Sequence, residues 1–394
     1  MNDNDVVIVG AARTPMGGFQ GALSPVASTE LGATAIAEAL RRAGVPTEQV
    51  DEVVMGCVLP AGLRQAPARQ AMRKAGLPDA TGAVTINKVC GSGMKAAMIA
   101  ADAIRAGTNN VMVAGGMESM TNAPYLLAGA RAGQRMGHGE MLDSMFTDGL
   151  EDADTGRAMG TFAQDTADAH QITRAEMDQF ATTSLERARR AQQNGAFDAE
   201  LTPIIVRTRK GETEVSADEQ PANADPTKIP KLRPAFKANG TVTAANSSSI
   251  SDGAAALVLT RADVAARDTL PIRARIVAHA THSQAPETFT LAPIGAIEKL
   301  LERTGWAKEE VDLFEINEAF AMVTMLATRA LGLDPEKVNV NGGACALGHP
   351  IGASGARIIV TLLHALEARG GKRGIAALCI GGGEATAVAI ERII

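Results

Sequence analysis

Short apolar runs alternate along the chain with longer segments whose apolar residues recur at helical spacing. Three runs of strand length share the first pattern: VVIVG at 6–10, VMVAGG at 111–116 and LCIGGG at 378–383. In residues 35–44 and 296–305, apolar positions follow a helical period until each pattern ends at a glycine, a common helix terminator. Strands that are apolar throughout are typical of sheets covered by helices on both faces. The alternation therefore predicts an α/β fold.

The same pattern occurs twice. Residues 35–56 align with residues 296–317 at a constant offset, and eight of the 22 positions are identical. At nearly the same offset, residues 90–107 align with residues 352–369, and both carry a Ser-Gly pair ahead of a long helical pattern. Repeated matches in one order predict two duplicated βαβαβαββ halves that bury a shared core.

A stretch without the repeat separates the two copies. It holds a Gly/Met-rich segment, an amphipathic charged helix and a Pro-rich polar run, at 126–142, 173–195 and 216–234. A strand and helix pattern after it completes the first half. We therefore expect three parts: an N-terminal half of residues 1–120 plus 251–270, a loop domain of residues 121–250, and a C-terminal half of residues 271–394.

Composition narrows the classes of partner. Apolar residues make up 46% of the chain and charged residues 21%, as in ordinary globular proteins. A net charge of −6 gives no general attraction to nucleic acid, and no apolar run approaches the ~20 residues of a membrane helix. The N-terminal residues do not read as a targeting signal. We expect a cytoplasmic protein without a membrane or nucleic-acid partner.

The four cysteines lie far apart, without a C-x-x-C pair, so neither a disulfide framework nor a zinc site is expected. Cys90 follows a strand-like run and precedes a helical pattern, with Gly91 and Gly93 allowing a sharp turn. A helix N-terminus can stabilise a thiolate and lower its pKa, which favours a nucleophile. A small buried hydrophobe is an equally good interpretation of Cys90 alone, because free cysteine is often buried.

Three other residues bear on that choice. His349 lies in a glycine-dense loop ahead of the second copy's helix, where it could act as the base for Cys90. Cys379 ends a strand before glycines, and taken alone it is better explained by core packing than by chemistry. Asn317 could be the N-cap of the helix that follows it. The other histidines have no metal-ligand spacing, and no dinucleotide or P-loop motif occurs, so we expect no metal and no resident cofactor.

Five ordered motifs together resemble the thiolase family, closest to its acetyl-CoA acetyltransferases. They are NKVCGSGMKA, VAGGMESMTNAPY, INEAFA, NVNGGACALGHPIGASGAR and LCIGGG. The resemblance covers essentially the whole chain and implies the thiolase fold, a layered α-β-α-β-α core with an inserted loop domain. It implies a homo-oligomer, in particular a tetramer formed as a dimer of dimers, with the Gly/Met-rich segment as its tetramerisation element.

The resemblance also assigns roles to matching residues. Cys90 would carry the acyl group, His349 would activate that thiol, and His349 with a water held by Asn317 would bind the thioester oxygen. Cys379 would move the proton at the α carbon, and the backbone N–H groups of Cys90 and Gly381 would form a second oxyanion hole. The positions that match the family's pantetheine pocket are Met159, Ser248, Ala319 and Phe320.

The implied reaction is the Claisen condensation of two acetyl-CoA to acetoacetyl-CoA and CoA, and the reverse thiolysis, with CoA as substrate or product rather than cofactor. The alternatives are a thiolase that prefers longer 3-ketoacyl-CoA and a non-catalytic protein that binds acyl-CoA or lipid. A β-ketoacyl synthase would be expected to use two histidines, and only one matches. Five positions depart from the usual family pattern: Ala158, where a histidine is frequent, Cys345, Glu384, Arg64 and Ala66.

Overall fold

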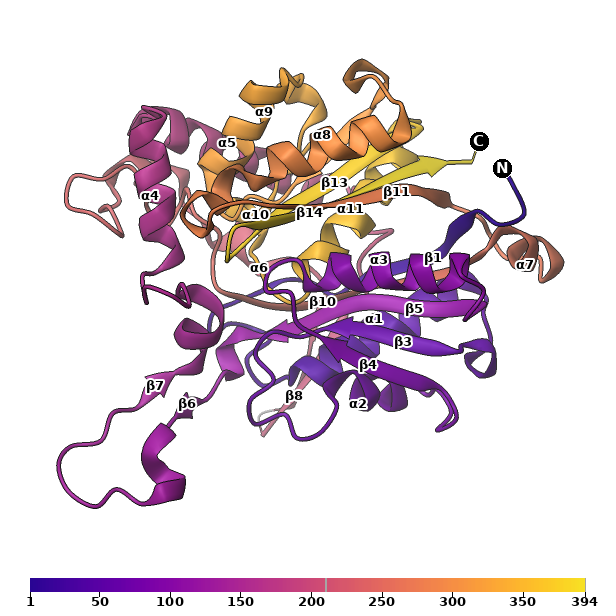
Figure 1. The fold of residues 1–394 in the computed structure, drawn as a ribbon, viewed down its shortest axis with the longest axis horizontal. Helices are drawn as coiled ribbons and strands as arrows, with labels where there is room; N and C mark the ends of the chain where they lie inside the picture. The colour runs from indigo at the N-terminus through magenta and orange to yellow at the C-terminus, as the bar shows by residue number, and fades with distance from the viewer. Residues whose placement is uncertain (210, 394) are drawn as a thin grey trace.

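A computed structural model describes residues 1–209 and 211–393, and its main feature is a long mixed sheet (Figure 1). The strand order is β12-β13-β14-β11-β1-β10-β5-β3-β4, and β2 (Gly17–Gly18) pairs with β10. The strands on this path are β1 (Val6–Arg13), β3 (Glu52–Gly56), β4 (Gly82–Ile86), β5 (Val111–Ser119), β10 (Ser251–Arg261), β11 (Ala274–Ser283), β12 (Leu313–Ile316), β13 (Arg373–Ile380) and β14 (Glu384–Arg392).

Each half of the sheet has the same strand arrangement. In the first half, β10 lies antiparallel between β1 and β5, and β3 and β4 continue parallel to β5. In the second half, β14 lies antiparallel between β11 and β13, and β12 continues parallel to β13. A parallel bridge from Phe314 to Val338 stands where β4 stands in the first half. The duplicated halves predicted from the sequence are confirmed, and they join through two residue pairs between β1 and β11.

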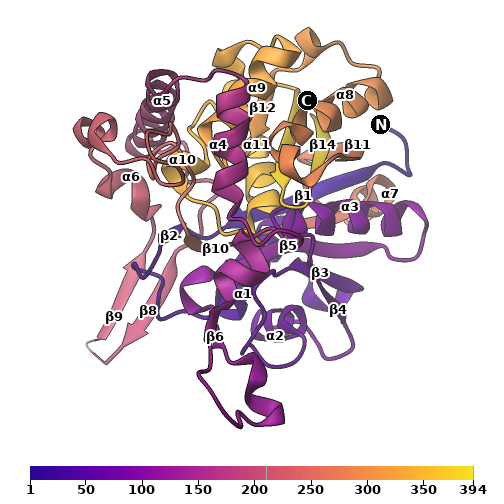
Figure 2. The same ribbon diagram turned by 60° about the vertical axis from the view of Figure 1, so that its left-hand side comes forward.

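Helices form three layers around the two halves. On the outer face of the first half lie α1 (Ser28–Ala43) and α2 (Pro67–Lys74). On the outer face of the second half lies α8 (Ala292–Thr304), with α9 (Ala321–Leu331) beside it. Between the halves, α3 (Ser92–Arg105) and α11 (Ser354–Arg369) contact each other and the strands of both sides. The layered α-β-α-β-α core is confirmed, and both central helices begin beside the same end of the sheet (Figures 1 and 2).

The central helices α3 and α11 approach closely because each has a glycine that faces the backbone of the other helix. A Cβ on Gly93 would stand 2.8 Å from the Ala356 nitrogen, and a Cβ on Gly355 would stand 2.4 Å from the Met94 nitrogen. Neither glycine has a positive φ, so space rather than backbone conformation requires them. This contact brings the N-termini of α3 and α11 together.

The region between β5 and β10 holds two longer helices and two hairpins, and short helices occur both in it and after β10. Its longer helices are α4 (Met159–Ala169) and α5 (Arg174–Gln193), and Thr173 caps α5 in a capping box with Glu176. The paired strands are β6 (Tyr125–Leu126) with β7 (Leu142–Asp143), and β8 (Ile204–Thr208) with β9 (Gly211–Val215). The short elements are α6 (Glu219–Asn223), α7 (Ala262–Arg267), which follows β10, and α10 (Ala344–Leu347).

Arg13, at the end of β1, anchors this region to the core. Its fully buried guanidinium pairs with Glu200 at 2.5 Å and Asp218 at 2.7 Å. Two carboxylates around one planar guanidinium compensate the cost of burying it. The boundaries expected for the three parts of the chain stay a prediction. In the part of the chain that the structure describes, no helix is long and apolar enough to cross a membrane.

Candidate active site

Cys90 lies in the turn that joins β4 to α3. The helix begins at Ser92, so Cys90 sits just outside the helix N-terminus, with its side chain partly buried. The glycines act differently from our expectation: Val89 takes the left-handed conformation, with φ 46°, whereas Gly91 has φ −81°. Gly91 serves close packing, because a Cβ there would stand 2.3 Å from Ile380 Cδ1. The nucleophile turn is thus pressed against the end of β13.

A pocket of about 400 Å³ opens at Cys90 and gathers most of the residues predicted from the sequence. Its wall includes Cys90, His349 and Gly381, together with all four positions matched to the pantetheine pocket: Met159, Ser248, Ala319 and Phe320. These residues come from both halves and from the inserted region. The duplicated fold therefore brings the two complementary loops together, as the repeat predicted.

Asn317 and Cys379 do not line the pocket wall but lie buried at strand ends behind it. Asn317 follows β12, and neither polar atom of its buried amide has a hydrogen-bond partner within the described residues. The helix-cap interpretation of Asn317 is wrong, because α9 begins at Ala321. Cys379 is fully buried near the end of β13; burial chiefly raises its pKa, and the nearby charge of Cys90 raises it further.

The pKa of Cys90 is raised to about 11, chiefly because burial penalises the thiolate. The expected lowering by the helix N-terminus is therefore wrong for the resting site. Backbone N–H groups of Gly381 and of Cys90 itself do lower the pKa, but by less than burial raises it. Both N–H groups lie beside the sulfur, close to where the oxygen of an attacked thioester would develop charge.

His349 is uncharged and has one nitrogen free to accept a proton. Burial lowers its pKa to about 3. Its Nδ1 lies 2.6 Å from Ser354 Oγ, and that hydroxyl donates to the Pro350 carbonyl. Ser354 must then accept from Nδ1–H, which leaves Nε2 unprotonated, and buried Nε2 has no partner among the described residues. His349 is thus held in the tautomer that a general base needs.

The far wall of the pocket is aromatic. Phe320 meets Phe236 and Phe289 edge-to-face, with ring centroids 6.3 and 6.5 Å apart. Sequence reasoning did not assign Phe236 or Phe289 to the site. Nothing in the local sequence pattern marks Phe236 as a pocket residue.

Three of the residues that depart from the family pattern lie in different surroundings. Ala158 precedes α4 and lines the pocket, so its methyl group replaces a polar contact there. Glu384 forms an ion pair with Lys88 at 2.5 Å, which connects the turn that carries Cys90 to the start of β14. Cys345 lies 3.7 Å from the Glu318 carbonyl oxygen. Within residues 1–209 and 211–393, no cluster of three histidine, cysteine or acidic side chains could hold a metal ion.

Comparison with known proteins places this site in one family. The thiolase N-terminal domain model matches residues 6–263, and the thiolase C-terminal domain model matches residues 270–392. Acetyl-CoA acetyltransferase 2 of Arabidopsis thaliana is 52% identical over 394 residues, which cover 99% of this chain and 98% of the relative.

Solved structures agree. The acetyl-CoA acetyltransferase of Bacillus anthracis superposes with a TM-score of 0.96 at 42% identity, over 99% of each chain. The Acat5 thiolase of Ascaris suum in complex with coenzyme A superposes with a TM-score of 0.93 at 40% identity, over 99% of this chain and 100% of the other.

Proposed function

The chain belongs to the thiolase family, and from that membership we propose that it is an acetyl-CoA C-acetyltransferase. It joins two acetyl-CoA into acetoacetyl-CoA and CoA, and it catalyses the reverse thiolysis. The observation that carries the proposal is the pocket in which the Cys90 thiol, the free Nε2 of His349 and the Gly381 N–H converge, with Cys379 directly behind. A non-catalytic binding protein would not need this set.

The first transfer acylates Cys90. His349 Nε2 takes the proton from the Cys90 thiol as the sulfur attacks the thioester carbonyl, and Cys379 gives its own thiol proton to the departing CoA sulfur. The N–H groups of Cys90 and Gly381 hold the developing oxyanion, a contribution typically worth ~3–4 kcal/mol per donor. Acetyl-Cys90 and free CoA result, which predicts ping-pong kinetics.

The second transfer forms the carbon–carbon bond. Cys379, now a thiolate, takes a proton from the α carbon of a second acetyl-CoA, and the protonated His349 with a water held by Asn317 stabilises the enolate oxygen. The α carbon attacks acetyl-Cys90, the bond to sulfur breaks, and His349 returns its proton to the Cys90 sulfur. Both thiols thereby return to their starting state, and the reaction consumes no net proton.

The remaining parts of the proposal concern binding and assembly. Met159, Ser248, Ala319 and Phe320 would contact the pantetheine arm of CoA, since all four line the pocket. The aromatic wall around Phe320 favours a short acyl group over the long chains of other 3-ketoacyl-CoA thiolases. CoA is a substrate or product, and the mechanism needs no resident cofactor. We further propose a homotetramer, and a cytoplasmic location stays a prediction.

CoA-dependent cleavage of acetoacetyl-CoA tests the activity, and kcat/KM on a C10 3-ketoacyl-CoA tests the chain length. We expect strong preference for acetoacetyl-CoA and, for Cys90→Ser, at least a ~10³-fold loss of kcat because a serine hydroxyl is a far weaker nucleophile here. Absence of turnover by the wild type would refute the proposal. A clear preference for the C10 substrate would move the chain to the longer-chain thiolases.

A further inference from the structure

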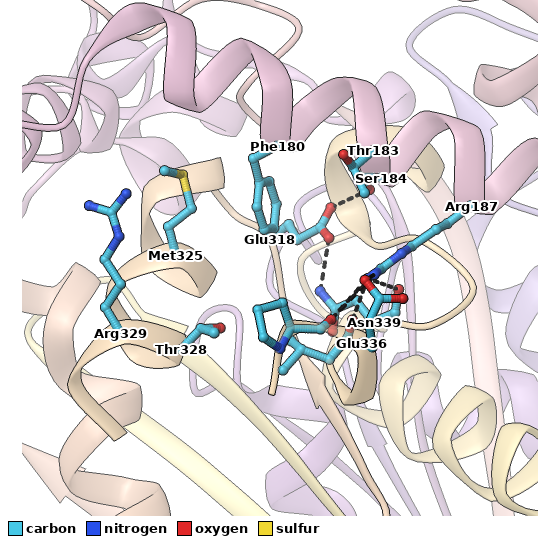
Figure 3. Close-up of a pocket in the computed structure, with 12 residues that line it drawn as sticks. Phe180, Thr183, Ser184, Arg187, Glu318, Met325, Thr328, Arg329, Glu336 and Asn339 are labelled. Atoms are coloured by element: carbon cyan, nitrogen blue, oxygen red, sulfur yellow. Dashed lines mark hydrogen bonds and ion pairs between the residues drawn. The ribbon is translucent and has the colours of Figure 1, made fainter. Parts of the chain in front are cut away.

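Glu318 is a fully buried carboxylate directly after Asn317, and the proposed mechanism does not use it. Its oxygens accept three hydrogen bonds: from Ser184 Oγ at 2.7 Å, Asn339 Nδ2 at 2.8 Å and the Cys345 N–H at 3.1 Å. Figure 3 shows the first two of these contacts beneath α5, at the inner end of a groove. The three donors belong to separate segments, so this one carboxylate joins them.

One of these contacts fixes the chain around Asn317. The Asn339 amide accepts from the Ile316 N–H and donates to the Ile316 carbonyl, both at 2.8 Å, while it also donates to Glu318. Asn339 therefore holds the residue before Asn317 and the residue after it. Its amide cannot flip without losing both backbone contacts, so its Nδ2 must face Glu318.

The other two contacts fix the loop that leads to His349. Glu318 accepts directly from Cys345, and Ser184 Oγ, which bonds Glu318, also accepts from the Gly343 N–H at 2.9 Å. A Cβ on Gly343 would stand 2.4 Å or less from Glu318 Cδ and Oε1, so the loop passes directly over the carboxylate. Only the single turn of α10 and Gly348 lie between Gly343, which Ser184 holds, and His349.

We propose that Glu318 is a positioning residue that sets the Asn317 amide against the His349 imidazole by fixing both segments that carry them. Asn317 and His349 come from different loops, and neither the Asn317 amide nor His349 Nε2 has a hydrogen-bond partner among the described residues. The inference rests on the proposed function, in which these two groups act on one oxygen.

Glu318→Gln is the sharpest test because it keeps the shape and removes the second acceptor oxygen. In one orientation the new amide's N–H groups face Asn339 Nδ2, and in the other they face the Cys345 N–H. A donor meets a donor in either case, so one of the two loops must shift. Displacements of about 1 Å at reacting groups can cost ~10²-fold in rate. We expect kcat for acetoacetyl-CoA thiolysis to fall 10- to 100-fold and KM to stay within about twofold, because the pantetheine wall is unchanged.

Glu336→Gln is the matched control. Glu336 lies on the same groove and pairs with Arg187, but its side chain is 84% exposed and contacts neither loop anchor. This variant should keep kcat and KM within about twofold of wild type. Ser184→Ala is a milder second variant, which removes one link and should lower kcat several-fold at constant KM.

Alkylation of Cys90 by iodoacetamide, followed by mass spectrometry of the Cys90 peptide, reads the His349 position without any substrate. We expect slower alkylation in Glu318→Gln and an unchanged rate in Glu336→Gln. If the wild type shows no turnover, the proposed function fails. The ratio of the Cys90 alkylation rates in Glu318→Gln and in the wild type would still decide the role of Glu318. Unchanged kcat and alkylation in Glu318→Gln would overturn the inference, as would unchanged values in Ser184→Ala should Glu318→Gln not fold.

Discussion

At the scale of single residues, the reacting pair at rest consists of a neutral thiol and a neutral imidazole. Burial raises the pKa of Cys90 to about 11 and lowers that of His349 to about 3, so a thiolate–imidazolium pair is disfavoured before substrate binds. Glu118, buried beside them with a pKa raised to about 7, also raises the Cys90 pKa when ionised. The nucleophile must therefore form by proton transfer to Nε2 during attack.

This pairing predicts how Cys90 reactivity depends on pH. A thiol that reacts only as free thiolate gains about tenfold in rate per pH unit below its pKa. With His349 as base the rate should rise much less steeply between pH 6 and 9, whereas His349→Gln should be slower at pH 7 and show the steep rise. Iodoacetamide alkylation of Cys90 across this range measures both slopes. Equal slopes in the two proteins would remove His349 from the base role.

The residues of this site differ in how far the sequence could predict them. Cys90 and His349 stand out because glycine-flanked positions differ between the two copies of the repeat, and a duplicated fold brings their loops together. The pKa of Cys90 was not predictable, since it depends on how much protein covers the sulfur. Phe236 reaches the pocket through contacts between segments far apart in the chain, which no local pattern encodes.

At the scale of elements, the contact between α3 and α11 decides how the two loops meet. Sequence patterns predicted both helices because their apolar positions repeat at helical spacing. The sequence predicts a turn role for Gly93, whereas the structure needs Gly93, like Gly355, for backbone contact across the helix pair. For a glycine-to-alanine substitution at either position, helix propensity therefore predicts a more stable protein, whereas packing predicts a less stable one.

Gly355→Ala separates those two effects. Propensity alone would stabilise the helix by ~1 kcal/mol, but the new methyl group would overlap the Met94 backbone, and overpacking typically costs ~1–3 kcal/mol. We expect a net loss of stability in urea unfolding and a loss of turnover as α3 and Cys90 shift. Gly129→Ala is the control, because nothing lies within 4 Å of its added Cβ. Equal stability of the two variants would contradict the packing argument.

His364 gives α11 a second measurable property. Its buried ring donates from Nδ1 to the Val360 carbonyl at 2.8 Å, and burial lowers its pKa to about 4. An unfolded chain binds that proton near pH 6.5, so the free energy of unfolding should fall as pH drops from about 6.5 to 4, by up to ~1.4 kcal/mol per pH unit from this group.

His364→Leu should flatten that fall, because leucine removes the titrating group and fills a similar volume. Urea unfolding at pH 7.5, 6 and 5, at one protein concentration, measures the slope, and His170→Leu, outside the arm of residues 125–143, provides an exposed comparison. His349 contributes in the same direction in both proteins, so only the difference in slope reports His364. An unchanged slope in His364→Leu would show that His364 is protonated in the folded protein near its unfolded value.

At the scale of the whole molecule, the repeat predicted the two halves and their order, because both copies carry the same alternation of strands and helices. It did not predict that β1 and β11 join the halves into one sheet, since two residue pairs leave no pattern in the sequence. Nor did it predict the shape of residues 125–143, which extend from the body as an arm in both views (Figures 1 and 2).

That arm carries the last prediction, which concerns assembly. Four of its apolar side chains are exposed: Tyr125 by 65%, Leu127 by 45%, Met136 by 97% and Met141 by 71%. A projecting group of exposed apolar residues is typical of a protein–protein contact, and the proposed tetramer would bury it between dimers. Replacing Leu127, Met136 and Met141 by glutamate should therefore shift the mass in light scattering from about four times 40.7 kDa to about twice that value.

Ile205→Glu, at a residue of β8 that is 46% exposed, should leave the mass unchanged. Turnover per chain should persist in the dimer, because none of residues 125–143 lines the pocket at Cys90. A tetramer that survives the triple substitution, or a wild type of monomeric mass, would contradict this assignment of the arm.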